Sequence, residues 1–325
     1  MSMSNINLYK KINKSFTTKV IFRLGDDAGF FSEYNNMILA MLYCLDHRYQ
    51  FVLSSKNANF SFDIGWNDYF EPFTNECNAK WIMPYNHRPY LINIRLPFLL
   101  RVLRRLKIYT PPDRSFFLSL LKRTNKILLT QDIFVQAHTL NTNENFEFST
   151  LGIQGSIRSA CRKLVELTWR FNPTTQSDIN DKIQSLQLPE RYLGFHIRSG
   201  DKNAEYPLIS PFVYVENAKR FSNLTKAFVL TDDYKVILEL QNEFPTWTFY
   251  TLCEKNEHGY YHSEFTQQPK NDIKEAHIKL FASIEILAKA DHFIGTYSSN
   301  PGMYLGMRMD PEKCHGVDFD KWRIW

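Results

Sequence analysis

From residue 191 onwards, short apolar runs that suit β-strands alternate with longer amphipathic stretches that suit helices. The expected strands span 191–197, 226–231, 247–252 and 292–297, and the expected helices span 211–222, 234–243, 272–290 and 301–309. Strands that are separated by a crossover helix run parallel, so this order predicts an α/β domain with a parallel sheet and helices on its faces.

The first half of the chain opens in a similar way, with a strand at 19–24, a helix at 32–47 and a second strand at 49–53. Gly25 and Gly29 lie in the loop GDDAG and do not form GxGxxG, so we expect no dinucleotide site there. Asp26, Asp27 and Glu33 are suited to contacting a hydroxyl-rich ligand, although turn and cap residues have the same composition. We interpret this half as Rossmann-like and its carboxylates as candidate acceptor-binding residues.

A domain boundary is expected near 170–175, where the helical pattern stops at RFNP. This gives an N-terminal domain of residues 1–172 and a C-terminal domain of residues 173–325, in keeping with a length of 325 residues. Residues 1–17 are polar and predict a loosely ordered lead-in. The aromatic-rich stretch 55–92 predicts a local core, with sugar stacking as the alternative.

Composition narrows the class of protein. The net charge of +5 suits an anionic small molecule or a membrane surface, but is too low to predict nucleic-acid binding. Five scattered cysteines without a CxxC pair indicate free thiols in a reducing compartment. With no signal peptide and no run of about 18 apolar residues, we expect a soluble, cytoplasmic protein.

A basic amphipathic stretch follows Pro97, with Arg101, Arg104 and Arg105 on its polar side. A helix of this kind lies either with its charges in solvent or on an anionic membrane surface, where a lipid-linked acceptor would be found. Peripheral contact with the inner face of a membrane is therefore one of two interpretations.

The strand at 191–197 leads into a loop that carries Arg198, Asp201, Lys202 and Glu205. The carboxyl ends of parallel strands line the ligand crevice, so Arg198 is well placed to hold a phosphate bidentately. Asp201 and Glu205 are then candidates for work on the reacting atom. The alternative is an ion-paired surface loop.

Carboxylates also follow the next strand, in Thr231-Asp232-Asp233. Asp233 is best interpreted as a helix N-cap, whereas Asp232 is open to ligand contact. TDD is not the DxD spacing that holds a divalent metal in many enzymes that use nucleotide sugars. The one DxD of the chain, Asp318 to Asp320, lies in the terminal tail. We therefore expect no metal site.

The last strand of the series ends in Ser298-Ser299-Asn300-Pro301. Small polar residues before a proline begin a helix whose N–H groups, with two hydroxyls, form an anion site suited to a diphosphate. An ordinary capped helix explains the same residues. What favours a ligand site is that three strand ends of one sheet all carry residue types that bind phosphate or hydroxyl groups.

HIRSGDK, TDD and ADHFIGTYSSN, in this order and at about these distances, resemble the donor half of the α-1,6-fucosyltransferases of glycosyltransferase family 23. The resemblance covers residues 170–309. It implies an α/β protein of the GT-B class, with two Rossmann-like domains facing across a cleft and the nucleotide sugar in the C-terminal one. It also implies metal-independent, inverting transfer of L-fucose from GDP-β-L-fucose to a hydroxyl of an oligosaccharide or lipid-linked glycan, with no further cofactor.

The resemblance assigns roles to the C-terminal loops. Arg198 would neutralise the β-phosphate of the donor, His196 would face the guanine, and Glu205 would be the catalytic base, one residue nearer to the arginine than in the family. The other matching positions are Asp201, Lys202, Asp232, Asp233, Ser298, Ser299 and Asn300, the last in place of a glutamine.

Two positions depart from the family. Ser199 replaces the second arginine of its HxRR motif, and Ser283 stands where an aspartate contacts the guanine edge, with Glu285 one position past its neighbour. A GT-B transferase for another nucleotide sugar is therefore one alternative. The shifted spacing of Glu205 leaves a second, a non-catalytic sugar-nucleotide-binding module.

Overall fold

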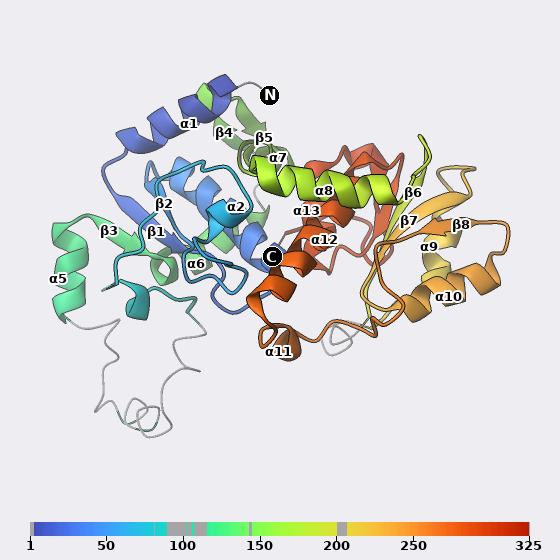
Figure 1. The fold of residues 1–325 in the computed structure, drawn as a ribbon. Coiled ribbons are helices and arrows are strands. Elements are labelled where there is room, and N and C mark those ends of the chain that lie inside the picture. The colour runs from blue at the N-terminus through green and yellow to red at the C-terminus, as the bar shows by residue number, and fades with distance from the viewer. Residues whose placement is uncertain are drawn as a thin grey trace. The chain divides into compact units, whose positions relative to one another are not determined.

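The computed structural model describes residues 3–80, 82–89, 102, 106, 116–142, 145–199 and 207–324 (Figure 1). The chain divides into two compact units, Met1–Arg170 and Phe171–Ile324. The division falls inside the interval 170–175 in which the sequence predicts a boundary.

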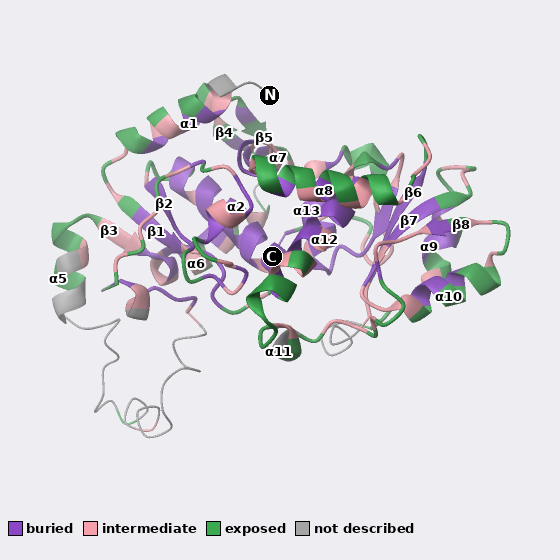
Figure 2. Cartoon of the chain, in the orientation of Figure 1, coloured by how far each residue is buried: buried purple, intermediate pink, exposed green. Residues whose placement is uncertain are grey.

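The first unit contains a parallel sheet with the strand order β2-β1-β3. These strands are β1 (Lys19–Arg23), β2 (Gln50–Ser54) and β3 (Ile127–Leu129). The helices are α1 (Met3–Ser15), α2 (Phe30–Asp46), α5 (Phe116–Thr124), α6 (Thr130–His138) and α7 (Ile157–Thr168). Helix α2 is buried along most of its length because it is apolar on nearly all sides, which is typical of a core helix (Figure 2).

The expectation of a loosely ordered lead-in is wrong, because residues 3–15 form helix α1. Ile6 and Tyr9 of this helix are buried. The amide of Asn13 accepts from the N–H of Phe51 (2.7 Å) and donates to its carbonyl (2.8 Å), so it takes both hydrogen-bonding groups that β2 presents there. Only a few residues of α1 face inward and most of the others are polar. The sequence of this segment therefore shows only a weak helical periodicity.

In the described part of the stretch 55–92, the buried aromatic residues Phe60, Trp66, Tyr69, Phe70 and Phe73 form a local core, as predicted. Trp66 is 1% exposed, and its ring stacks on that of Phe70 with centroids 4.2 Å apart. Phe30 and Trp169 lie against the same Phe70 ring, at 5.8 and 5.1 Å. These rings face one another rather than solvent, so they cannot stack on a sugar.

Short elements absent from the prediction include the antiparallel pair β4 (Phe146–Phe148) and β5 (Ile153–Gly155).

The second unit contains a five-stranded parallel sheet with the order β10-β9-β6-β7-β8. The strands are β6 (Leu193–Ile197), β7 (Lys226–Thr231), β8 (Thr248–Tyr250), β9 (Phe293–Gly295) and β10 (Cys314–Gly316). The helices are α8 (Pro173–Ser185), α9 (Pro211–Ala218), α10 (Tyr234–Glu243), α11 (His262–Phe265), α12 (Lys270–Lys289) and α13 (Asn300–Arg308). The alternation in the sequence is therefore confirmed.

The two faces of this sheet are covered by different helices. Leu193, Phe195 and Ile197 of β6 pack with apolar residues of α9 and α10 in one buried cluster. The intervening Gly194 faces α12, where a Cβ would lie 2.9 Å from Leu287 and 3.0 Å from Ala290. A glycine at this position lets α12 pack closely against the central strand.

Among the described residues, no helix has both the length and the apolar character needed to cross a bilayer. Most of the basic stretch that contains Arg101, Arg104 and Arg105 lies outside the described residues, as do those three arginines. The five cysteines are free thiols in the structure.

Candidate functional site

Three of the predicted loops meet at the carboxyl edge of the second sheet. Its strand order reverses between β6 and β9, and the crevice at such a point is where open α/β sheets bind ligands. Phe195 of β6 lies opposite Ile294 of β9, so Arg198 is level with Tyr297, three residues further along each strand. The register of β6 with β7 likewise puts Arg198 level with Asp232. Three separate sequence motifs are thus brought to one edge.

Arg198 and Asp232 lie side by side at this edge. The guanidinium Nε is 3.7 Å from Asp232 Oδ2, and the two side chains are 23% and 18% exposed. Asp232 Oδ1 accepts from the N–H of Ser199 at 2.8 Å. The cation expected at the strand end is therefore present, partly buried and held by a carboxylate.

Tyr260 belongs to the same edge, although nothing in the sequence singled it out. Its N–H donates to Asp232 Oδ2 (3.2 Å), and the N–H of Gly259 donates to the carbonyl of Asp232 (2.7 Å). The Tyr260 ring lies with its centroid 6.0 Å from the guanidinium carbon of Arg198, within the range of a cation–π contact. The segment around it has no regular period, so only tertiary contacts reveal it.

Asp233 is the N-cap of α10, and its carboxylate accepts from the N–H of Lys235 at 3.0 Å. The N-cap interpretation is confirmed. A contact of this kind stabilises a helix by about 1 kcal/mol.

The loop between β9 and α13 is organised around the hydroxyl of Ser299, which is 1% exposed. This hydroxyl donates to the carbonyl of Thr296 (2.8 Å) and accepts from the N–H of Gly302 (3.3 Å) as the N-cap of α13. His196 Nδ1 lies 3.3 Å from the same oxygen. The capped-helix interpretation therefore accounts for Ser299. The neighbouring Ser298 is also buried, at 7% exposed.

His196 is 2% exposed, so its ring supports this loop from within the sheet. Burial, together with the positive charge of Arg198, lowers the pKa of His196 to about 3. The imidazole is therefore neutral at physiological pH and adds no positive charge to the site.

Asp318 of the C-terminal tail forms hydrogen bonds to the backbone of the same loop. Its carboxylate accepts from the N–H groups of Tyr297 (2.7 Å) and Ser298 (2.8 Å). A protein carboxylate therefore takes the Ser298 N–H in this structure. Asp318, noted in the sequence only as part of a DxD pair, is a brace for the β9–α13 loop.

Asp201, Lys202 and Glu205, which the sequence assigns to catalysis, lie outside the described residues. Asn300 is the first residue of α13 at this edge.

The acidic residues expected to bind an acceptor are mostly engaged within the first unit. Glu33 accepts from the N–H groups of Gly25 (3.0 Å), Asp27 (3.3 Å) and Ala28 (3.2 Å), and it pairs with Arg88 at 2.7 Å. The carboxylate of Glu33 is fully buried, and so it organises the turn from within.

Asp26 is likewise fully buried, 3.0 Å from a guanidinium nitrogen of Arg23 and 3.0 Å from His87 Nδ1. The turn-and-cap alternative thus describes Asp26 and Glu33, whereas Asp27 is exposed.

Ser283, one of the two departures from the family, and the nearby Glu285 also bond to protein groups. The Ser283 hydroxyl donates to the Lys279 carbonyl one turn earlier (2.9 Å). The carboxylate of Glu285 accepts hydrogen bonds from both terminal guanidinium nitrogens of Arg308, at 2.5 and 2.9 Å. In the part of the chain that the structure describes, no three His, Cys, Asp or Glu side chains are grouped so as to hold a metal ion.

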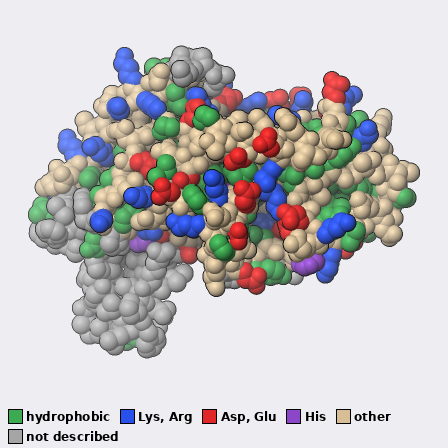
Figure 3. Space-filling model, in the orientation of Figure 1, with side chains coloured by type: hydrophobic (Ala, Val, Ile, Leu, Met, Phe, Trp, Pro, Cys, Tyr) green, Lys and Arg blue, Asp and Glu red, His purple; other side chains and the backbone are tan. Residues whose placement is uncertain are grey.

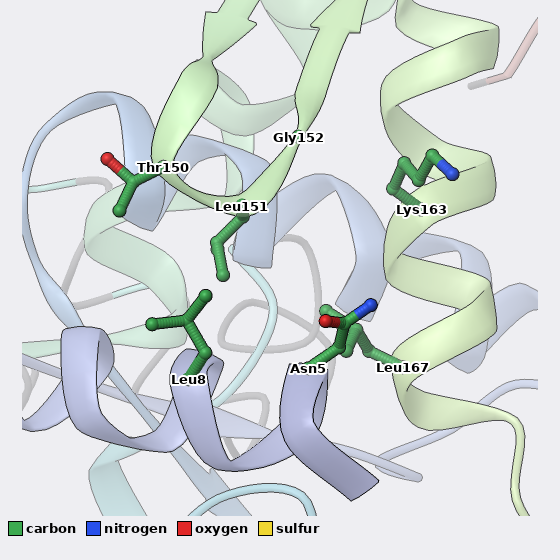
Figure 4. Close-up of a pocket in the computed structure, with 7 residues that line it drawn as sticks. All are labelled: Asn5, Leu8, Thr150, Leu151, Gly152, Lys163 and Leu167. Atoms are coloured by element: carbon green, nitrogen blue, oxygen red, sulfur yellow. The ribbon is translucent and has the colours of Figure 1, made fainter. Parts of the chain in front are cut away.

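A cavity of about 250 Å³ lies in the first unit, between α1, the turn that precedes β5, and α7 (Figure 4). It is lined by Asn5, Leu8, Thr150, Leu151, Gly152, Lys163 and Leu167. None of the predicted site residues lines it.

On the face shown in Figure 3, basic and acidic side chains are interspersed, which is unlike a nucleic-acid-binding surface.

The fold is similar to that of solved fucosyltransferases. A crystal structure of the NodZ α-1,6-fucosyltransferase soaked with GDP-fucose matches with a TM-score of 0.53 and 14% identity, covering 90% of this chain and 92% of that one. The Bradyrhizobium NodZ fucosyltransferase gives 0.51, with 14% identity and 89% and 91% coverage. A mutant of Arabidopsis thaliana FUT1 in complex with GDP gives 0.50, with 12% identity and 93% and 73% coverage.

No protein-family model matches the sequence, and no curated protein matches it. The resemblance to α-1,6-fucosyltransferases is thus confirmed as a likeness of fold, with parallel α/β sheets as predicted.

Proposed function

We propose that the protein is a metal-independent, inverting glycosyltransferase that moves L-fucose from GDP-β-L-fucose to a hydroxyl of a glycan acceptor. The observation that carries this proposal is the position of Arg198, at the carboxyl end of β6 where the strand order reverses. Support comes from the fold that the chain shares with a fucosyltransferase soaked with GDP-fucose. The second unit would take the donor and the first unit the acceptor.

The proposed reaction is a single displacement. The acceptor oxygen forms a bond to the anomeric carbon while the bond from that carbon to the diphosphate oxygen breaks, which inverts the configuration from β to α. The electron pair of the broken bond leaves with GDP, and Arg198 stabilises the charge that develops on the diphosphate. Ser298 and Asn300 would contact the diphosphate through their side chains.

A base must remove the proton of the acceptor hydroxyl as the new bond forms. By resemblance this base is Glu205, with Lys202 and Asp201 beside it, and the proton passes to the Glu205 carboxylate. Asp27, the exposed acidic residue of the first loop, remains a candidate for contact with the acceptor.

Binding and turnover of the donor test the proposal. GDP at 100 times its dissociation constant should raise the free energy of unfolding by about 2.7 kcal/mol, which a thermal shift detects. Arg198→Ala should lower donor turnover about 10²-fold or more, equivalent to about 3 kcal/mol of transition-state stabilisation.

Arg191→Ala is the matched control, since Arg191 forms an ion pair with Asp291 beside the amino end of β9 and should leave turnover unchanged. Donor turnover should persist in EDTA. Normal turnover by Arg198→Ala, or a strict need for a divalent metal, would contradict the proposal.

A transferase for another nucleotide sugar is the second candidate. It is favoured by Ser283 and Glu285, whose polar groups bond to Lys279 and Arg308. Thermal shifts with GDP, UDP, ADP and TDP separate the candidates, since the preferred base gives the largest shift. A protein that binds one of them without hydrolysing or transferring its sugar would be a binding module.

A further inference from the structure

Asp232 contacts several other residues at the candidate site. Its Oδ1 accepts from the Ser199 N–H, its Oδ2 accepts from the Tyr260 N–H, and its main-chain carbonyl accepts from the Gly259 N–H. Oδ2 also lies 3.7 Å from Arg198 Nε. One residue therefore joins the loop after β6 to the segment that carries Tyr260.

We infer that Asp232 is a positioning residue, which holds Arg198 and the Tyr260 segment in the geometry that binds a diphosphate. This inference rests on the proposed function, and it replaces the sequence-based assignment of Asp232 to direct donor contact.

The contacts of Asp232 argue against direct donor contact. Each carboxylate oxygen already accepts one backbone N–H group, so about half of the acceptor sites of Asp232 are taken by main chain. A carboxylate also repels a diphosphate, and its charge is useful here only next to the cation. The short bonds are those to the backbone, whereas the distance to Nε is 3.7 Å. Asp232 thus acts mainly by fixing main chain on both sides of the guanidinium.

The position of Asp232 affects which edge of the Arg198 guanidinium is suited to bind a phosphate. Because Asp232 lies at the Nε side of the guanidinium, the planar fork of Nη1 and Nη2 is the edge suited to bidentate phosphate binding. The Ser199 N–H contact fixes the backbone next to Arg198, and the Tyr260 contact keeps the aromatic ring beside the guanidinium plane. Removing the carboxylate removes all three restraints together.

A double-mutant cycle tests this inference, with GDP binding measured by isothermal titration calorimetry. Asp232→Asn should weaken GDP binding about 10-fold in the wild-type background, and less than about 2-fold when Arg198 is already alanine, since its effect passes through the arginine. Asp291→Asn, which breaks the ion pair with Arg191, is the matched control and should leave GDP binding unchanged. Equal effects of Asp232→Asn in both backgrounds, or no effect, would overturn the inference.

Hydrogen exchange of the ligand-free proteins decides the same question without a donor. Asparagine keeps a single acceptor oxygen, so at least one of the Ser199 and Tyr260 amides should exchange faster in Asp232→Asn than in wild type, whereas both should exchange at the wild-type rate in Asp291→Asn. Unchanged exchange at both amides overturns the inference. If wild type binds none of the four nucleoside diphosphates, the proposed function fails, whereas the exchange rates still show whether Asp232 holds the two segments.

Discussion

Acid should destabilise this protein through a histidine that is buried in its neutral form. His277 lies on α12 and is 5% exposed, with its Nδ1 2.7 Å from the carbonyl oxygen of Ile273 and its ring against Phe265 at 5.6 Å. Burial lowers its pKa from 6.5 to about 4, and the hydrogen bond to Ile273 opposes this only in part. The perturbation is a fall in pH, with His277→Gln as the variant that cannot titrate.

The sign and size follow from linkage. Because the pKa of His277 is lower in the folded protein, the unfolded chain takes up a proton first and unfolding becomes easier as pH falls. The contribution is fully present above pH 6.5 and is lost between pH 6.5 and about 4. At about 1.4 kcal/mol per pH unit, the loss is about 2 kcal/mol by pH 5.

Urea unfolding followed by circular dichroism at pH 7, 6 and 5 measures this loss. Wild type should lose about 2 kcal/mol more than His277→Gln between pH 7 and pH 5. His196 contributes in the same direction in both proteins, so its effect cancels in the comparison. Any change in stability that the glutamine causes for other reasons is the same at pH 7 and at pH 5. It therefore does not affect the difference between the two pH values. Parallel pH profiles for the two proteins would refute the reasoning.

Two further changes test the packing that positions the loops. Glu33→Gln removes the charge that pairs with Arg88, which is 3% exposed, and should lower the free energy of unfolding by about 3–5 kcal/mol; an unchanged thermal midpoint would contradict the buried pair. Gly302→Ala places a Cβ 1.9 Å from the carbonyl oxygen of Thr296 and should cost about 1–3 kcal/mol in chemical denaturation. Gly29→Ala, with no atom within 4 Å of the new Cβ, is its control, and equal stabilities for the two variants would count against the contact.

Several features of the fold follow from local sequence patterns. The alternation after residue 191 predicts β6 to β9 and the helices α9, α10, α12 and α13 to within a few residues, because burial of one face imposes a period of two or of 3.6. It does not predict β10 or α11. The N-cap role of Asp233 is also local, since the carboxylate bonds to an N–H two residues away. The loop after β6 that contains Arg198 is recognisable for the same reason.

The candidate site was predictable only in part. The roles of Tyr260 and Asp318 could not be predicted because their partners, Arg198 and the Tyr297–Ser298 backbone, are distant in the sequence. Helix α1 was missed because its packing on β2 depends on Asn13, a residue that is more often exposed.

The amino-acid sequence by itself determined the α/β class, the parallel strands and the residue types at each strand end, since all of these depend on neighbours within a few positions. Only the tertiary structure decided that β9 lies beside β6, and that Asp232 and Asp318 bond to backbone while Glu33 is buried beneath its loop. The physical reason is that a hydrogen-bond partner is chosen by proximity in space, which chain folding creates between residues as far apart in sequence as Tyr34 and Thr168.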